Sequence, residues 1–178
     1  MEKIIDLIQA DSIRKQVLFH TSQLNLPDCY VAAGFVRNLV WDSLHGFTEP
    51  TPLNDVDIIY FDTSEENLDA YKYYEQILTN AMPSINWQVR NQAYMHSRNG
   101  DKPYKSSLDA MSYWPEKETA IAIRMINSDS FECVAAFGFD SLFNLELTHN
   151  PKRSKEIFDQ RVQAKSWLKH WQRLKVVY

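Results

Sequence analysis

The segment Asp55-Val56-Asp57-Ile58-Ile59-Tyr60-Phe61 is the part of this chain that decides its fold. Its apolar run predicts a buried strand, and two carboxylates stand at the start of that strand. Residues i and i+2 of a strand point to the same face, so Asp55 and Asp57 (the carboxylate pair) project side by side. Two adjacent like charges are costly unless a cation lies between them. Mg²⁺, which is commonly held by one or two carboxylates plus substrate phosphates, meets this need.

A second segment predicts an anion site. Residues 29–33 are expected to form a short strand that turns at Gly34 into a helix. Glycine permits close backbone approach, and a helix N-terminus offers unpaired N–H groups to an anion. Arg37 and Asn38 fall in the first turn of this helix, where a guanidinium can bind phosphate through two hydrogen bonds. Most such glycines only make turns, but together with the carboxylate pair this one indicates a triphosphate bridged by Mg²⁺ to two aspartates.

The composition predicts one domain over residues 1–178, because the chain has 44% hydrophobic and 24% charged residues. We expect N-terminal helices over 1–27, a catalytic core over 28–150 and a basic C-terminal helix over 151–178. Residues 151–178 hold eight Lys or Arg and two acidic residues, whereas the whole chain has a net charge of -4. This distribution excludes a uniformly basic nucleic-acid binder but not a basic helix that meets an anionic partner.

The cysteine usage and the N-terminus indicate a cytoplasmic protein. Cys29 and Cys133 lie in apolar stretches outside any metal-ligand spacing, so we expect buried free thiols in a reducing compartment. The N-terminus carries charges within its apolar run, and no stretch reaches about 18 apolar residues. We therefore expect neither a signal peptide nor a membrane partner.

The hydrophobic periodicity predicts an α+β fold in which helices pack on a mixed sheet. Helices are expected over residues 2–10, 11–27, 35–45, 64–80, 107–113 and 154–174. Strands are expected over residues 29–33, 55–62, 85–95, 120–125, 131–135 and 145–148, with a hairpin turn at 127–130. Asp11 is the expected N-cap of the second helix, and Gly46 the expected C-cap of the third.

With these motifs the chain resembles the nucleotidyltransferase superfamily that includes DNA polymerase β and the CCA-adding enzymes. Ala33-Gly34-Phe35-Val36-Arg37-Asn38 resembles the Gly-Gly-x-Val-Arg-Asp motif of CCA-adding enzymes and poly(A) polymerases. Asp55-Val56-Asp57 resembles their metal-binding Asp-x-Asp. Over most of its length the chain is similar to a bacterial family of nucleotidyltransferase-like proteins. The resemblance implies a sheet like the palm of polymerase β, with additional helices at both ends.

The resemblance also implies an activity, the Mg²⁺-dependent transfer of an NMP from an NTP to a hydroxyl acceptor. Asp55 and Asp57 would be catalytic and would hold one or two Mg²⁺ ions. Gly34, Arg37 and Asn38 would bind the triphosphate. The acceptor is open: a small molecule or a protein fits as well as an RNA that binds the basic C-terminal helix. Trp167 and Trp171 of that helix are expected to pack inside the protein rather than to stack on bases.

The chain departs from the superfamily pattern in three respects. The first glycine of the doublet is Ala33, which fits if its φ is negative. The final Asp of the motif is Asn38, which can form hydrogen bonds but supplies no charge. The superfamily also has a third acidic residue, on a neighbouring strand, that activates the attacking hydroxyl. The strand expected at 85–95 has no Asp or Glu, and Glu132 on a later strand is the expected substitute. If no carboxylate reaches the pair, the alternative is a catalytically inactive nucleotide-binding or interaction module with the same fold.

Four more polar residues are candidates for substrate binding. Asn91 is expected beside the carboxylate pair as a neutral ligand or a ribose or base contact, with Gln92 next to it. The alternative is that both satisfy neighbouring loop backbones. His96 would contact phosphate or act in proton transfer, unless it only ends the strand. Arg124 would pair with an aspartate of the pair or with phosphate, or else form a buried salt bridge.

Overall fold

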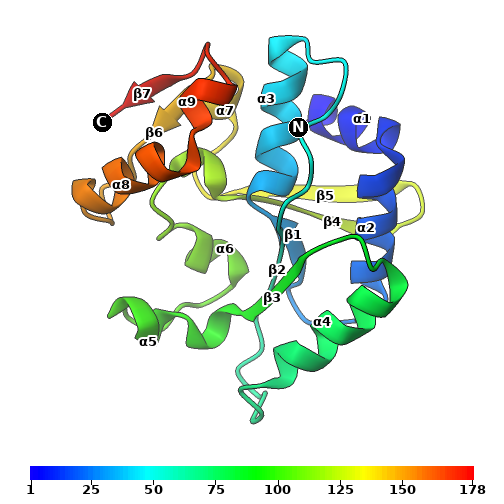
Figure 1. The fold of residues 1–178 in the computed structure, drawn as a ribbon. Helices are drawn as coiled ribbons and strands as arrows, with labels where there is room; N and C mark the ends of the chain where they lie inside the picture. The colour runs from blue at the N-terminus through cyan, green and yellow to red at the C-terminus, as the bar shows by residue number, and fades with distance from the viewer.

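The computed structural model describes all residues of the chain, 1–178, and its centre is a five-stranded sheet with the order β3-β2-β1-β4-β5 (Figure 1). The strands are β1 (Tyr30–Ala32), β2 (Val56–Tyr60), β3 (Trp87–Asn91), β4 (Ile121–Asn127) and β5 (Ser130–Ala135). Strands β2 and β3 are parallel, and the other neighbouring pairs are antiparallel. The sheet is therefore mixed, and the predicted α+β fold is confirmed.

Helices cover both faces of this sheet (Figure 1). One face carries α1 (Glu2–Ala10), α2 (Ser12–Ser22), α3 (Gly34–His45) and α4 (Ala70–Ala81). The other carries α5 (His96–Asn99) and α6 (Ser107–Met111). The alternation of side chains along β2 explains this division: Ile58 belongs to the large core under α1–α4, whereas Ile59 belongs to a smaller cluster with Met111 of α6.

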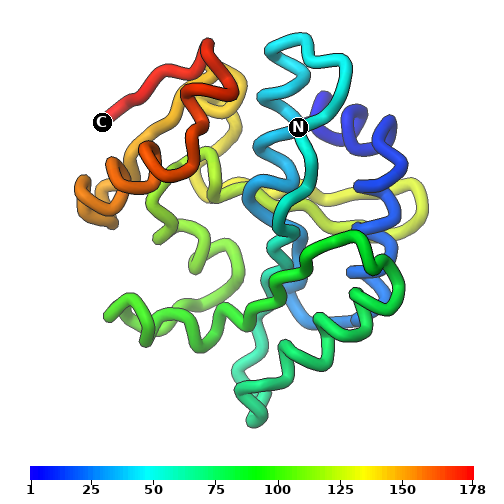
Figure 2. The backbone as a smooth tube through the Cα atoms, viewed as in Figure 1, coloured from blue at the N-terminus to red at the C-terminus, as the bar shows by residue number.

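The last part of the chain, from residue 140 onward, adds a second unit beside α3 (Figure 2). It contains α7 (Asp140–Phe143), β6 (Glu146–Thr148), α8 (Lys155–Lys165), α9 (Trp167–His170) and β7 (Lys175–Val177). Strands β6 and β7 form a separate parallel two-stranded sheet. The single helix expected over 154–174 is wrong, because Ser166 takes the left-handed conformation (φ +53°) between α8 and α9.

Side-chain caps set several boundaries. The Asp11 side chain accepts a hydrogen bond from the Arg14 backbone N–H (2.9 Å), and Gly46 at φ +71° ends α3, as predicted. Helix α2 ends at Ser22 rather than at Pro27. The expected hairpin between β4 and β5 is present.

Two predicted elements are too long because polar side chains form turns within them. Asp62 accepts hydrogen bonds from the Ser64 N–H and hydroxyl, and α4 begins only at Ala70. The strand predicted over 85–95 ends at Asn91, whose side chain accepts from the Ala93 N–H and starts a 3₁₀ turn. These local bonds compete with the helix and the strand that periodicity alone predicts.

Ala33 connects β1 to α3 in a strained conformation. Its φ is +58° and its ψ is −125°, so the expectation of a negative φ is wrong. The tertiary structure imposes this angle from both sides. The Ala33 N–H donates to the Ile121 carbonyl (2.9 Å), and the Ala33 carbonyl accepts from the N–H groups of Val36 and Arg37 (3.2 and 3.0 Å). A side chain at such a φ costs about 1–3 kcal/mol.

Replacing Ala33 by Gly is therefore expected to stabilise the protein by about 1 kcal/mol, because glycine adopts positive φ without steric cost. Urea unfolding followed by circular dichroism measures this change. Ala32→Gly is the matched control, since Ala32 lies in β1 at an ordinary φ and is fully buried. That control should destabilise the protein. Equal destabilisation by both variants would show that Ala33 is not strained.

Cys29 directly precedes β1, and Cys133 lies in β5. Cys29 and Cys133 are free thiols, and burial raises the pKa of each to about 12. Cys133 is buried, whereas Cys29 is partly exposed. None of the helices is both long and apolar enough to span a bilayer.

Candidate active site

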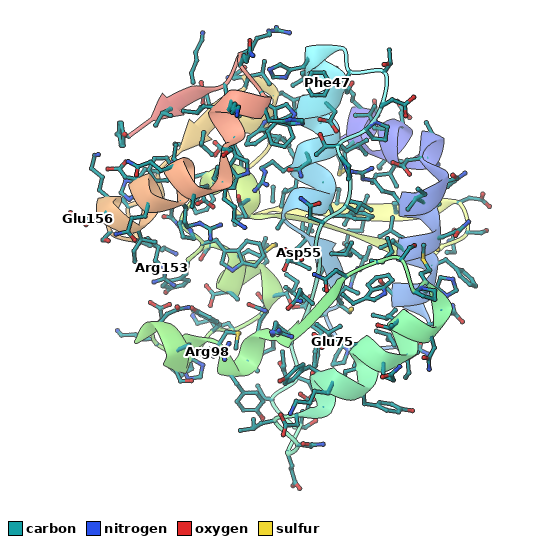
Figure 3. The ribbon with its side chains drawn as sticks, viewed as in Figure 1. Phe47, Asp55, Glu75, Arg98, Arg153 and Glu156 are labelled. Carbon is teal, nitrogen blue, oxygen red and sulfur yellow. The ribbon has the colours of Figure 1, made fainter.

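The carboxylate pair lies at the start of β2, near the centre of the view in Figure 3, where Asp55 is labelled. Asp57 stands between Ala32 of β1 and Gln88 of β3 in the strand register. Ala32 is small and leaves room above the sheet. Burial raises the pKa of Asp57, and the neighbouring Asp55 charge raises it further. The two carboxylates therefore form a site that favours a bound cation.

The residues present fit Mg²⁺. Asn86 donates a hydrogen bond to the Asp55 side chain. The Asp57 side chain has no hydrogen-bond or ion-pair partner, and only burial and nearby charges shift its pKa. No group of three or more His, Cys, Asp or Glu side chains is placed to hold a metal. The carboxylate pair thus offers oxygen ligands from two side chains. Mg²⁺ is usually bound by one or two protein carboxylates, with substrate phosphates and water as its other ligands.

Arg37 is the second part of the site. It is 5% exposed and forms no ion pair with a carboxylate; its guanidinium donates to the Thr119 hydroxyl (2.5 Å) and to Asn38 Oδ1 (2.9 and 3.2 Å). The guanidinium also lies over the rings of Trp41 (5.1 Å) and Trp167 (4.6 Å). Burial lowers its pKa to about 10, so it remains charged at neutral pH. A buried cation held by neutral partners is well suited to bind an anion.

Gly34 leaves the space that such an anion needs. A Cβ atom at this position would lie 3.3 Å from Asn38 Nδ2 and 3.5 Å from Arg37 Nη2. Gly34 is the first residue of α3, so the unpaired N–H groups of the helix lie beside this space. The structure therefore brings Gly34, Arg37 and Asn38 together, as the sequence predicts.

Two cavities meet at the carboxylate pair. The first, of about 520 Å³, lies against the N-terminus of α3 and is lined by Gly34, Arg37 and Asn38; we call it the α3 cavity. The second, of about 390 Å³, is lined by Gln88 and Arg90; we call it the β3 cavity. Asp55 and Asp57 line both cavities, which places the pair at their boundary.

Asp42 fixes the outer wall of the α3 cavity. Its carboxylate is 3% exposed and accepts hydrogen bonds from the Thr51 N–H and hydroxyl (both 2.7 Å) and from Trp171 Nε1 (2.8 Å). His170 Nε2 contacts the Thr51 hydroxyl at 2.8 Å. One carboxylate thus joins α3, the loop that leads to the carboxylate pair, and the end of α9.

Replacing Asp42 by Ala is expected to lower the free energy of unfolding by about 3 kcal/mol, because the N–H groups of Thr51 and Trp171 lose a buried acceptor. Urea unfolding measures the loss. Asp42→Asn keeps one acceptor oxygen and should cost less. A loss below about 0.5 kcal/mol for Asp42→Ala would contradict a wall built on this carboxylate.

Two basic residues of the site are not evident from the sequence. Lys165, at the last turn of α8, lines both cavities, and its charge partly offsets the rise that burial causes in the pKa of Asp57. Arg161 lines both cavities too and pairs with the fully buried Glu116 (2.5 Å). The basic composition of residues 151–178 was the only available signal, and it does not show which residues face inward.

Two further basic residues of this segment have carboxylate partners. Arg153 pairs with Asp101 (2.5 Å), and Lys155 pairs with Asp159 (2.6 Å). Trp167 and Trp171 are 5% and 3% exposed, so they pack inside the protein as expected.

Glu132 and Arg124 lie away from the carboxylate pair. Glu132 is on β5, three strands from β2 in the sheet order, and the expectation that it reaches the pair is wrong. Its carboxylate pairs with Arg124 (2.5 Å) and accepts from the Tyr30 hydroxyl (3.0 Å). Arg124 therefore forms a salt bridge, but its side chain and that of Glu132 are 36% and 43% exposed, so the expected burial of this bridge is wrong. The physical reason is register, because Arg124 is directly opposite Glu132 across β4 and β5.

The structure also separates Asn91 from the pair. Asn91 is opposite Tyr60 in the register, on the other face of the sheet from Asp57, so its expected place beside Asp57 is wrong. Its side chain holds the loop after β2 by accepting from the Asp62 N–H (3.1 Å) and donating to the Asp62 carbonyl (2.8 Å).

The side chains of Gln92 and His96 form hydrogen bonds mainly with nearby backbone carbonyl groups. Gln92 Nε2 donates to the Arg90 carbonyl (3.2 Å), although the side chain also lines the β3 cavity. His96 Nδ1 contacts the Ala93 carbonyl at 2.9 Å, and its ring lies against Tyr104 with centroids 6.0 Å apart. His96 does not line either cavity.

A mixed sheet with a carboxylate pair on one strand, beside a strand that runs through glycine into a helix, is the arrangement of the nucleotidyltransferase class. The comparisons agree with this class. A family model described as nucleotidyltransferase matches residues 20–176, and the chain belongs to this family.

A solved structure supports the same fold. An NMR structure described as revealing a CCA-adding enzyme head domain is similar to the chain with a TM-score of 0.86 and 27% sequence identity. The match covers 99% of this chain and 95% of that chain. No curated protein matches the chain.

Proposed function

We propose that this protein is a Mg²⁺-dependent nucleotidyltransferase that moves an NMP from an NTP to an acceptor in the β3 cavity. The observation that carries the proposal is that a buried guanidinium and two carboxylates line one cavity without forming ion pairs. Arg37 is a buried cation without a carboxylate partner, and neither Asp55 nor Asp57 forms an ion pair with a Lys or Arg side chain. A triphosphate with its Mg²⁺ supplies a partner to both.

The residues have separate roles in this proposal. Gly34 leaves room for phosphate oxygens beside the N–H groups of α3, and Arg37 donates hydrogen bonds to them. Asn38 accepts from Arg37 and holds its guanidinium toward the cavity. Lys165 supplies a further positive charge next to the pair. Mg²⁺ bound by Asp55 and Asp57 would neutralise charge on the α-phosphate and orient it.

Calorimetry and a pyrophosphate assay test the proposal together. ATP, GTP, CTP and UTP should each be titrated into the protein with Mg²⁺ and with EDTA. We expect binding that Mg²⁺ strengthens at least about tenfold, and pyrophosphate release when an acceptor is present. Failure of all four nucleotides to bind with Mg²⁺ would refute the proposal.

The inactive module is the second candidate, and one observation favours it. Gln88, which cannot take up a proton, stands directly beside Asp57 on β3. Mg²⁺-dependent nucleotide binding without pyrophosphate release under any acceptor condition would support this candidate. Pyrophosphate release that depends on the carboxylate pair would exclude it.

A further inference from the structure

The β3 cavity lies where an acceptor must approach. In an in-line displacement, the attacking oxygen and the leaving oxygen stand on opposite sides of the phosphorus. Arg37 and Asn38 line only the α3 cavity, so a pyrophosphate leaving group held by them lies on that side of the carboxylate pair. The attacking oxygen then comes from the β3 cavity. This assignment rests on the proposed function.

Outside the carboxylate pair, the β3 cavity holds no carboxylate, imidazole or thiol that could take a proton from a hydroxyl. Apart from the carboxylate pair, which the metal would occupy, its lining contains no Asp, Glu, His or Cys. Gln88 is the residue in register with Asp57. The Tyr104 hydroxyl already donates to Asp101 (2.5 Å), and burial raises its pKa. A hydroxyl acceptor would therefore have to attack without a carboxylate or imidazole base.

The cavity is instead basic. Arg90, Arg161 and Lys165 line it, and the carboxylate pair supplies its only acidic residues. Arg90 and Arg161 each have one carboxylate partner outside the cavity, Glu75 (2.6 Å) and Glu116 (2.5 Å). Lys165 belongs to none of the ion pairs around the cavity. Once the pair has bound its metal, the remaining charges favour an anion.

We propose that the acceptor is a phosphate monoester rather than an alcohol. A phosphate monoester is largely dianionic at neutral pH because its second pKa is about 6, so its oxygen attacks without losing a proton. The bond from this oxygen to the α-phosphorus forms while the bond from the α-phosphorus to the β-phosphate oxygen breaks. Pyrophosphate leaves with the electron pair of the broken bond. The product carries the nucleotide and the acceptor on the two ends of a pyrophosphate linkage.

Glycerol 3-phosphate is a suitable probe because one molecule offers both nucleophiles. It should be incubated with each of the four NTPs and Mg²⁺, and the products examined by ³¹P NMR. Attack by phosphate gives two coupled pyrophosphate resonances, whereas attack by a hydroxyl gives a phosphodiester and leaves the monoester resonance intact. We expect the first pattern. A phosphodiester product, or Mg²⁺-dependent nucleotide binding with no transfer to the phosphate, would overturn the inference while leaving nucleotide binding established.

The Gln88→Glu variant separates the two acceptor classes by the sign of its effect. For a phosphate acceptor, a new negative charge in the β3 cavity should raise the acceptor KM at least about tenfold. For a hydroxyl acceptor, the new carboxylate would supply the absent base and raise kcat. Gln76→Glu, an exposed residue on α4, carries the same charge change and should alter neither constant. An increase in kcat for Gln88→Glu would refute a phosphate acceptor.

A binding measurement tests recognition of the acceptor phosphate without requiring turnover. With a non-hydrolysable ATP analogue and Ca²⁺ filling the α3 cavity, glycerol 3-phosphate should shift the backbone amide resonances of Gln88 and Arg90, whereas glycerol should not. Equal shifts with both compounds would contradict recognition of the phosphate group. Mg²⁺–ATP calorimetry in the same buffer reports separately on the proposed function, so the two failures can be told apart.

Discussion

Replacing Asp57 by Asn is expected to lower Mg²⁺-dependent pyrophosphate release at least about 10³-fold, because under the proposed function the variant loses a metal ligand worth several kcal/mol in the transition state. The same change should raise the melting temperature of the metal-free protein. Burial and the Asp55 charge raise the pKa of Asp57 above its unfolded value, so its ionisation opposes folding. Asparagine keeps the shape and removes that charge. The variant should thus be more stable without metal and inactive with it.

The pH dependence follows from the sign of this shift. The folded state binds a proton at Asp57 more tightly than the unfolded state, so Asp57 makes stability fall as pH rises from its unfolded pKa, about 3.9, through its raised folded pKa. Asp57→Asn should lack this part of the fall. Thermal unfolding across pH, with and without Mg²⁺, measures both effects. Asp6→Asn, at an exposed position on α1, is the control. A melting temperature of Asp57→Asn that still rises with Mg²⁺ as in the wild type would rule out Asp57 as a ligand.

Replacing Arg37 by Met should weaken Mg²⁺–ATP binding about 10²-fold, the expected loss of one or two charge-assisted hydrogen bonds to phosphate. Folding should be affected far less. Methionine fills a similar volume between Trp41 and Trp167, and it removes the cost of burying a cation that has no carboxylate partner. We therefore expect a change in the free energy of unfolding within about 1 kcal/mol. Calorimetry and urea unfolding measure the two quantities.

Two other variants make the Arg37 result specific. Arg37→Lys keeps the charge but loses the planar fork, so its affinity should lie between those of the wild type and Arg37→Met. Arg98→Met removes a charge from exposed α5, away from Asp55 in Figure 3, and should bind nucleotide as the wild type does. Wild-type affinity in Arg37→Met would mean that the triphosphate does not lie along α3.

The sequence was most informative where function depends on neighbours in the chain. Gly34, Arg37 and Asn38 share one helical turn, and Asp55 and Asp57 share one strand face, so local geometry already brings each group together. The family and the fold are confirmed. The element boundaries were less predictable where side chains such as Asp62 and Asn91 bond to nearby backbone and end a periodic pattern early.

The sequence by itself determined the glycine turn into α3, the carboxylate pair and the alternation of strands and helices, because each depends on spacing within a few residues. Only the tertiary structure decided what surrounds the pair. Strand register placed Gln88 beside Asp57 and Glu132 three strands away, and the break at Ser166 left Lys165 facing the site. Ala33 acquired its positive φ from bonds to β4 and α3. Strand register and packing bring together residues that are far apart in the chain, and no local sequence pattern encodes such contacts.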